Sequence, residues 1–141
     1  MNIYFACSIT GGRIFEPAYQ EFTHFLLENG HEVPTAHLAE SNVMALEKVI
    51  DPREVYERDA GWIKACDALI AEVSAPSHGV GYEIGFALEH GKSVLCLAQK
   101  DVAVSKMITG NPHESLQVNF YQDTNEGIGF IRDFMSQLAC E

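Results

Sequence analysis

Short apolar runs alternate with helix-type segments along almost the whole chain, and this alternation restricts the fold more than any other feature. The runs with strand character are Asn2–Cys7, His31–Thr35, Ala68–Val73, Ser93–Ala98 and Leu116–Tyr121. Several of them are apolar at nearly every position, which is typical of strands that are covered on both faces. The pattern therefore predicts a parallel sheet with helices on both sides.

Helices are expected between these strands, and several of their ends carry capping signals. The predicted helices are Pro17–Asn29, Pro52–Cys66, Tyr82–His90, Val104–Thr109 and Thr124–Leu138. Residues 37–50 are expected to be part loop and part helix. Gly30 and Gly91 provide C-terminal stops, and Asp51 is placed as an N-cap. The order predicts an α/β protein with a flavodoxin-like, doubly wound, five-stranded parallel sheet, built as a single domain over residues 1–141.

The charge balance and the cysteines restrict the partners and the compartment. The chain of 141 residues has 20 Asp and Glu against 9 Lys and Arg, a formal net charge of -11. Such a surface repels nucleic acid and anionic membranes, so we expect a small-molecule ligand, with no nucleic acid and no membrane partner. No apolar run is long enough to span a bilayer, and the N-terminus lacks signal-peptide features. Without a C-x-x-C motif, the cysteines indicate a reduced, cytoplasmic protein, with buried thiols at Cys7, Cys66 and Cys96.

Two loops rich in glycine and serine follow the first and third predicted strands. In doubly wound sheets, ligands bind beyond the carboxyl ends of the strands, so Ser8–Arg13 and Ser74–Gly81 are the first places to expect a site. The small residues of the first loop let backbone N–H groups approach an anion, and Arg13 adds a guanidinium. An ordinary turn between a strand and a helix has a similar composition.

Asp59 and Glu83 are the candidate catalytic carboxylates. Asp59 falls on the apolar stripe of its helix, while Arg58 and Lys64 are expected to point elsewhere. An exposed Asp59, or one that caps a loop, is the competing interpretation. Glu83 follows a glycine-rich loop and is expected in the first turn of a helix, where carboxylates are common for electrostatic reasons alone. Two carboxylates in one crevice are the minimal equipment for cleaving a glycosidic bond.

Four further side chains have both a functional and a structural interpretation. Tyr4 lies on the first strand, where it can orient a carboxylate or fill the core. His37 follows the second predicted strand and lines the crevice or lies on the surface. Trp62 and Met107 are expected in the core or in a pocket wall.

Four segments together resemble the nucleoside 2-deoxyribosyltransferase family, and within it the 2′-deoxynucleoside 5′-phosphate N-hydrolases. They are Ile3–Arg13, Asp59 with Trp62, Ala71–Gly85 and Ser105–Gly110. The resemblance covers the chain from Asn2 to about Tyr121. It implies that Glu83 is the nucleophile, that Asp59 assists departure of the base, and that Tyr4 orients the nucleophile.

The resemblance also informs the expected substrate contacts and the assembly. We expect contacts from Ser8, Ile9, Gly11, Gly12, Arg13, His37, Ser77, Gly79, Ser105 and Met107. Ser77 stands where phosphate-using members carry serine and the free-nucleoside transferases carry aspartate. Ser105 matches a serine that reaches the phosphate from a neighbouring subunit, which implies a homodimer. Thr10 stands where the loop of the phosphate hydrolases carries arginine, so one cation of that pattern is missing.

The implied activity is hydrolysis of the N-glycosidic bond of 2′-deoxynucleoside 5′-monophosphates. The products are a free base and 2-deoxyribose 5-phosphate, formed through a glycosyl ester of Glu83. Such chemistry needs no cofactor and no metal. One alternative is a nucleoside 2-deoxyribosyltransferase that exchanges bases between free deoxynucleosides. A second is a non-catalytic nucleotide-binding domain, which the pairing of Asp59 with Glu83 argues against.

Overall fold

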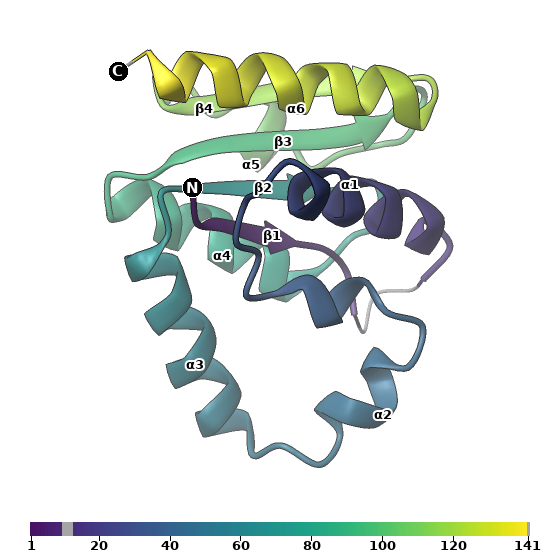
Figure 1. Cartoon of the computed structure of the whole chain (residues 1–141), viewed down its shortest axis with the longest axis vertical. Helices are drawn as coiled ribbons and strands as arrows, with labels where there is room; N and C mark the ends of the chain where they lie inside the picture. The colour runs from purple at the N-terminus through teal and green to yellow at the C-terminus, as the bar shows by residue number, and fades with distance from the viewer. Residues whose placement is uncertain (10–12, 141) are drawn as a thin grey trace.

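A parallel sheet forms the centre of the chain, which the computed structural model describes at residues 1–9 and 13–140. Its strands are β1 (Ile3–Ala6), β2 (Ala68–Glu72), β3 (Ser93–Gln99) and β4 (Leu116–Tyr121). They pair in the order β1-β2-β3-β4, and every pair is parallel (Figure 1). The predicted α/β class and parallel sheet are therefore confirmed.

The sheet has four strands in the described part of the chain, not the five that were predicted. The segment expected as the second strand joins the sheet by a single bridge, between Asn2 and Glu32. Pro34 has no N–H with which to continue a ladder, and the chain turns into the short 3₁₀ helix η1 (Ala36–Ala39). The Thr35 hydroxyl accepts a hydrogen bond from the Phe5 N–H at 2.9 Å. This backbone donor of β1 is therefore not available for pairing with a further strand.

The long helices cover both faces of the sheet. The helices α1 (Glu16–Glu28) and α6 (Thr124–Ala139) pack on one face, and α3 (Pro52–Ala65) and α4 (His78–Glu89) pack on the other (Figure 1). Side chains alternate between these faces along each strand. Phe5 therefore packs with α1, whereas Tyr4 packs on the face that α3 and α4 cover.

Two short helices complete the order of elements. The helix α2 (Val43–Glu47) follows η1, which confirms that residues 37–50 are part loop and part helix. The helix α5 (Lys106–Thr109) is shorter than predicted and lies between β3 and β4 in the chain.

No helix of the described residues combines the length and the apolarity that crossing a membrane requires. Buried free thiols at Cys7, Cys66 and Cys96 confirm another prediction.

Helix α4 begins four residues earlier than predicted, at His78 instead of Tyr82. The Ser77 hydroxyl caps it by accepting a hydrogen bond from the Val80 N–H at 3.3 Å. The glycines in this stretch predicted a loop because they are poor helix formers. Burial of Val80 against the sheet offsets that preference. Glu83 consequently lies in the second turn of the helix and not in the first.

Candidate active site

Tyr4, Asp59 and Glu83 meet on the sheet face that α3 and α4 cover. Tyr4 comes from β1 and is fully buried. Burial raises the pKa of the Tyr4 phenol, and the neighbouring carboxylates of Glu83 and Asp59 raise it further. The Tyr4 hydroxyl makes no hydrogen bond within 3.5 Å to any described residue, but it lies close enough to Glu83 to lower the pKa of that carboxyl. The structure thus brings the three predicted catalytic side chains together.

Glu83 has a strongly perturbed carboxyl. Its burial raises the pKa of Glu83 to about 8, against an ordinary value of 4.5. The Tyr4 hydroxyl and the Arg58 guanidinium oppose this rise, whereas the charge of Asp59 adds to it. Part of the residue remains accessible to solvent. A buried carboxyl beside a second carboxyl is characteristic of catalytic sites.

We expect Glu83→Gln to make the fold more stable than wild type at alkaline pH. Because the folded-state pKa of Glu83 is about 8 and its ordinary value is 4.5, its contribution to stability is complete below pH 4.5. That contribution is lost as the pH rises through 8, since the buried carboxyl must then ionise. Glutamine stays neutral, so the two free energies of unfolding should diverge between acidic and alkaline pH. Urea unfolding measures them, and the exposed Glu89→Gln on the same helix is the control. Parallel pH dependences for wild type and Glu83→Gln would contradict the assigned pKa.

Asp59 is held by Arg58, its neighbour in the sequence. The Arg58 Nε donates to the Asp59 Oδ1 at 2.8 Å, and both side chains are largely buried. The expectation that Arg58 points away from Asp59 is therefore wrong. The long Arg58 side chain folds back over the ring of Trp62, with its guanidinium carbon 4.9 Å from the ring centroid. Burial raises the pKa of Asp59, and the bond and charge of Arg58 oppose that rise.

Arg58 also connects α3 to α2 and to His37. One Nη of Arg58 donates to the Glu47 Oε1 at 3.2 Å, and the His37 Nε2 lies 3.2 Å from the same oxygen. The His37 ring meets the ring of Trp62 edge to face, with centroids 6.1 Å apart. The contact of Arg58 with Glu47 could not be predicted from the sequence, because it joins residues on different helices and no periodicity indicates it. The structure places His37 and Trp62 near Asp59, and their rings pack against each other.

Ser77 and Gly79 stand at the start of α4, next to Glu83. A Cβ atom at Gly79 would lie 3.6 Å from the Glu83 Oε1 and 3.9 Å from the Ser77 Oγ. The hydroxyl and the carboxyl therefore border the same small volume, and the missing side chain of Gly79 leaves it open. A substrate that contacts Ser77 can reach Glu83 without moving the backbone.

Arg13 makes extensive contacts with the main chain. One of its Nη atoms donates to the carbonyl oxygens of Ser8 and Leu38 at 3.0 and 2.9 Å, and the other donates to that of Glu40 at 2.9 Å. These bonds fasten the loop after β1 to the segment that follows η1. The guanidinium thus has a structural role in addition to the substrate contact predicted from the sequence.

Ser8 and Ile9 are the other predicted residues of the first loop that the structure describes. The Ser8 hydroxyl is buried and has no hydrogen-bond partner among the described residues. Ile9 is partly buried and packs against the core beneath α1. Thr10, Gly11 and Gly12 lie outside the described residues.

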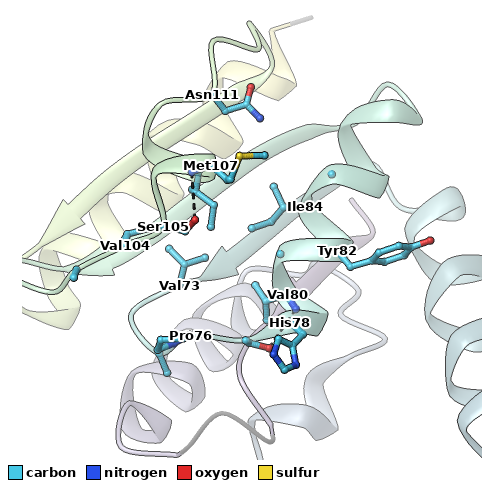
Figure 2. Close-up of a pocket in the computed structure, with 16 residues that line it drawn as sticks. Val73, Pro76, His78, Val80, Tyr82, Ile84, Val104, Ser105, Met107 and Asn111 are labelled. Carbon is cyan, nitrogen blue, oxygen red and sulfur yellow. Dashed lines mark hydrogen bonds between the residues drawn. The ribbon is translucent and has the colours of Figure 1, made fainter.

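A cleft of about 910 Å³ lies between α4 and α5, and it holds Ser105 and Met107 (Figure 2). The Ser105 hydroxyl caps α5 by accepting a bond from the Met107 N–H at 3.2 Å. Met107 is 83% exposed. Ser77 lines this cleft as well, whereas the three predicted catalytic side chains do not. Ser105 and Met107 are therefore not among the groups that surround Glu83 within one chain.

Paired carboxyls with a buried tyrosine, set over a parallel α/β sheet, match the equipment of enzymes that cleave glycosidic bonds. The family model for nucleoside 2-deoxyribosyltransferase matches residues 3–126, and the chain belongs to this family. The carboxyls of Asp59 and Glu83 both fall within the matched region.

Individual relatives agree with this assignment. A Methanosarcina mazei protein with the provisional name 2′-deoxynucleoside 5′-phosphate N-hydrolase 1 is 42% identical over 137 residues, which is 97% of this chain and 85% of the relative. An Esox lucius protein named 5-hydroxymethyl-dUMP N-hydrolase is 35% identical over 145 residues, which is 99% of each chain. The structure of a CMP N-glycosidase from Clostridium botulinum has a TM-score of 0.74 at 22% identity, covering 95% of this chain and 99% of that one. This last similarity shows the fold.

Proposed function

We propose that the chain hydrolyses the N-glycosidic bond of 2′-deoxynucleoside 5′-monophosphates. The products are a free base and 2-deoxyribose 5-phosphate. The observation that carries this proposal is the meeting of Glu83, Asp59 and Tyr4 on one face of the sheet in a member of this family. The N-hydrolase names of the relatives support the choice of a nucleotide substrate and of water as the acceptor.

In the first step, a carboxylate oxygen of Glu83 attacks the anomeric carbon of the deoxyribose. The bond from this carbon to the base breaks, and the base leaves with the electron pair through an oxocarbenium-like transition state. Tyr4 orients the attacking carboxylate. Because the pKa of Glu83 is about 8 in the free chain, the reactive ionised form becomes more abundant as the pH rises towards that value.

Asp59 serves the departing base and then the incoming water. Arg58 holds the Oδ1 of Asp59, which leaves Oδ2 to exchange a proton with the base. In the second step, water attacks the anomeric carbon of the glycosyl ester, Asp59 takes the proton that the water loses, and the Glu83 carboxylate is released. The two steps balance with water as the only co-reactant, so the proposal includes no metal or cofactor.

Ser77 explains why the substrate carries a 5′-phosphate. Its hydroxyl, at the N-terminal end of α4, can donate to a phosphate oxygen without adding a negative charge. The predicted contacts of the loop Ser8–Arg13 and of His37 complete the binding of phosphate, sugar and base.

We expect Ser77→Asp to reduce kcat/KM for a deoxynucleoside monophosphate by at least about tenfold relative to the matching nucleoside. Aspartate caps a helix as well as serine does, so the fold is kept while a negative charge faces the phosphate. Ser77→Asn is the matched control, because asparagine caps the helix without a charge. The measurement is the ratio of kcat/KM for the monophosphate to kcat/KM for the nucleoside, determined for Ser77→Asp and for Ser77→Asn. Equal effects of aspartate and asparagine, or a wild type that prefers the nucleoside, would contradict this role of Ser77.

We further propose that a second copy of the chain occupies the cleft between α4 and α5. The cleft exposes the apolar side chain of Met107, and the glycines of α4 at 81 and 85 have no atom within 4 Å of a Cβ position. Small residues on an open helix face let another backbone approach closely. In the resulting homodimer, Ser105 reaches the phosphate bound by the partner chain.

Gly85→Leu should convert the dimer to monomers and abolish most of the base release. Within one chain the leucine has room, and it raises the helix propensity of α4 by about 0.8 kcal/mol, so folding should not suffer. Gly129→Leu on α6, where the Cβ position is equally open, is the matched control and should stay dimeric. Sedimentation equilibrium gives the masses. A fully active wild-type monomer, or a dimeric Gly85→Leu variant, would contradict the proposed dimer.

We also place this activity in the cytoplasm. The cysteines are free thiols, and Cys7, Cys66 and Cys96 are buried. Free thiols persist in reducing compartments.

A further inference from the structure

Glu72 is a buried carboxyl that the proposed reaction does not use. It is the last residue of β2, and its exposed fraction is 0%. Ala68 and Ile70 alternate with it and pack on the face covered by α1 and α6. Glu72 therefore faces away from Tyr4 and the catalytic carboxyls, and it cannot touch the reacting atoms.

Neutral donors surround the Glu72 carboxyl. Its Oε1 accepts a hydrogen bond from the Ser74 N–H at 2.7 Å, and its Oε2 accepts from the Ser74 hydroxyl at 3.0 Å and from the Tyr121 hydroxyl. The Ser74 hydroxyl in turn accepts from the Gln99 N–H at 2.8 Å. No cationic side chain of the described residues forms an ion pair with Glu72. A buried carboxyl without a cation is costly, so its hydrogen bonds must supply the compensation.

These contacts fasten the loop 73–77 to the ends of three strands. Glu72 belongs to β2, Gln99 ends β3 and Tyr121 ends β4. The Val73 N–H adds a bond to the Leu97 carbonyl of β3 at 2.8 Å. Ser77 lies at the other end of this short loop, where it caps α4.

We propose that Glu72 is a positioning residue that fixes the loop 73–77 and so sets where Ser77 meets the 5′-phosphate. The phosphate part of this inference rests on the proposed function, whereas the fixing of the loop does not. A carboxylate suits the task because both of its oxygens accept hydrogen bonds. A glutamine would present an NH₂ group either to the Ser74 N–H or to the hydroxyls of Ser74 and Tyr121. Because these groups are donors as well, the hydrogen bonds on that side of the side chain would be lost.

The proposed role predicts an effect that distinguishes two substrates. In Glu72→Gln, KM for a deoxynucleoside monophosphate should rise about tenfold, while kcat changes by less than about threefold. The kcat/KM of the matching nucleoside should stay near the wild-type value, because it has no phosphate to place. If Glu72 were needed only for stability, its substitution would lower kcat/KM for both substrates alike.

Hydrogen exchange tests the fixing of the loop independently of catalysis. In Glu72→Gln the backbone amides of residues 73–80 should exchange faster, whereas the exchange rates of the sheet amides should stay unchanged. Inorganic phosphate should bind more weakly to this variant. Tyr121→Phe removes one hydrogen bond of the network, and Ser74→Ala removes the hydroxyl that bonds both Glu72 and Gln99. Both variants should give smaller changes of the same kind, which covers the case that Glu72→Gln does not fold. Ile131→Val in the core of α6 is the control for a general loss of stability.

The outcomes separate this inference from the proposed function. A wild-type chain that releases no base refutes the proposed function, and the exchange of residues 73–80 then decides the role of Glu72 alone. Exchange that is unchanged, or that is faster over the whole chain as in the control, overturns the inference. An equal loss of kcat/KM for monophosphate and nucleoside overturns it as well.

Discussion

Glu83→Gln is expected to lower kcat for base release by about 10⁴-fold or more, because it removes the proposed nucleophile and leaves only substrate binding and Asp59. Glutamine matches glutamate in size, and it relieves the cost of a carboxyl whose pKa burial raises to about 8. The variant should therefore fold, bind the monophosphate and fail to turn it over. Steady-state release of free base, together with equilibrium binding of the same monophosphate, measures the two properties.

The control for this variant lies on the same helix. Glu89 is exposed near the end of α4, so Glu89→Gln should keep wild-type turnover. Retention of more than about one per cent of kcat by well-folded Glu83→Gln would remove Glu83 from the nucleophilic role. A loss of binding equal to the loss of turnover would instead make Glu83 a binding residue.

Asp59→Asn is expected to lower kcat/KM by about 10²- to 10³-fold, because an amide cannot exchange a proton with the departing base. The substitution should also shift the pH profile. The charge of Asp59 raises the pKa of Glu83, so its removal should move the rising limb of kcat/KM to lower pH. The pH dependence of kcat/KM for one monophosphate, recorded for wild type and Asp59→Asn, shows both effects.

Two comparisons make the Asp59 result specific. Glu57→Gln on the same helix breaks only an exposed ion pair with Arg53 and should change neither rate nor profile. Arg58→Met should move the rising limb the other way, because Arg58 lowers the pKa values of both carboxyls. Near-normal turnover by Asp59→Asn, with a loss of thermal stability only, would make Asp59 a structural residue.

The fold could be predicted from the sequence where local pattern and packing agree. The runs that became β2 and β3 are mostly apolar, and the run that became β4 has an apolar residue at every second position. Each of the three strands is found within one residue of its predicted bounds at both ends. The predicted second strand failed because Pro34 and the hydroxyl of Thr35 interrupt the backbone pairing. The start of α4 was misplaced because burial of Val80 outweighs the low helix propensity of the glycines beside it.

The site could be predicted only in part, because its electrostatics depend on contacts between distant segments. Tyr4, Asp59 and Glu83 stood out by residue type, position and resemblance, and the structure brings them together. The pairing of Arg58 with Glu47 and the bond from Tyr121 to Glu72 join residues on different elements. No local pattern predicts such pairs, so the influence of Arg58 on the carboxyls of Asp59 and Glu83 could be found only in the folded chain.

Product analysis of the wild-type chain tests the central claim most directly. The chain is incubated with a deoxynucleoside 5′-monophosphate, or with the matching deoxynucleoside plus a second free base, and the products are separated by chromatography. The account predicts free base and 2-deoxyribose 5-phosphate in equal amounts from the monophosphate, and little reaction of the nucleoside. Formation of a new nucleoside from the second base would contradict it in favour of base exchange. Binding of the monophosphate without release of base would contradict it in favour of a non-catalytic domain.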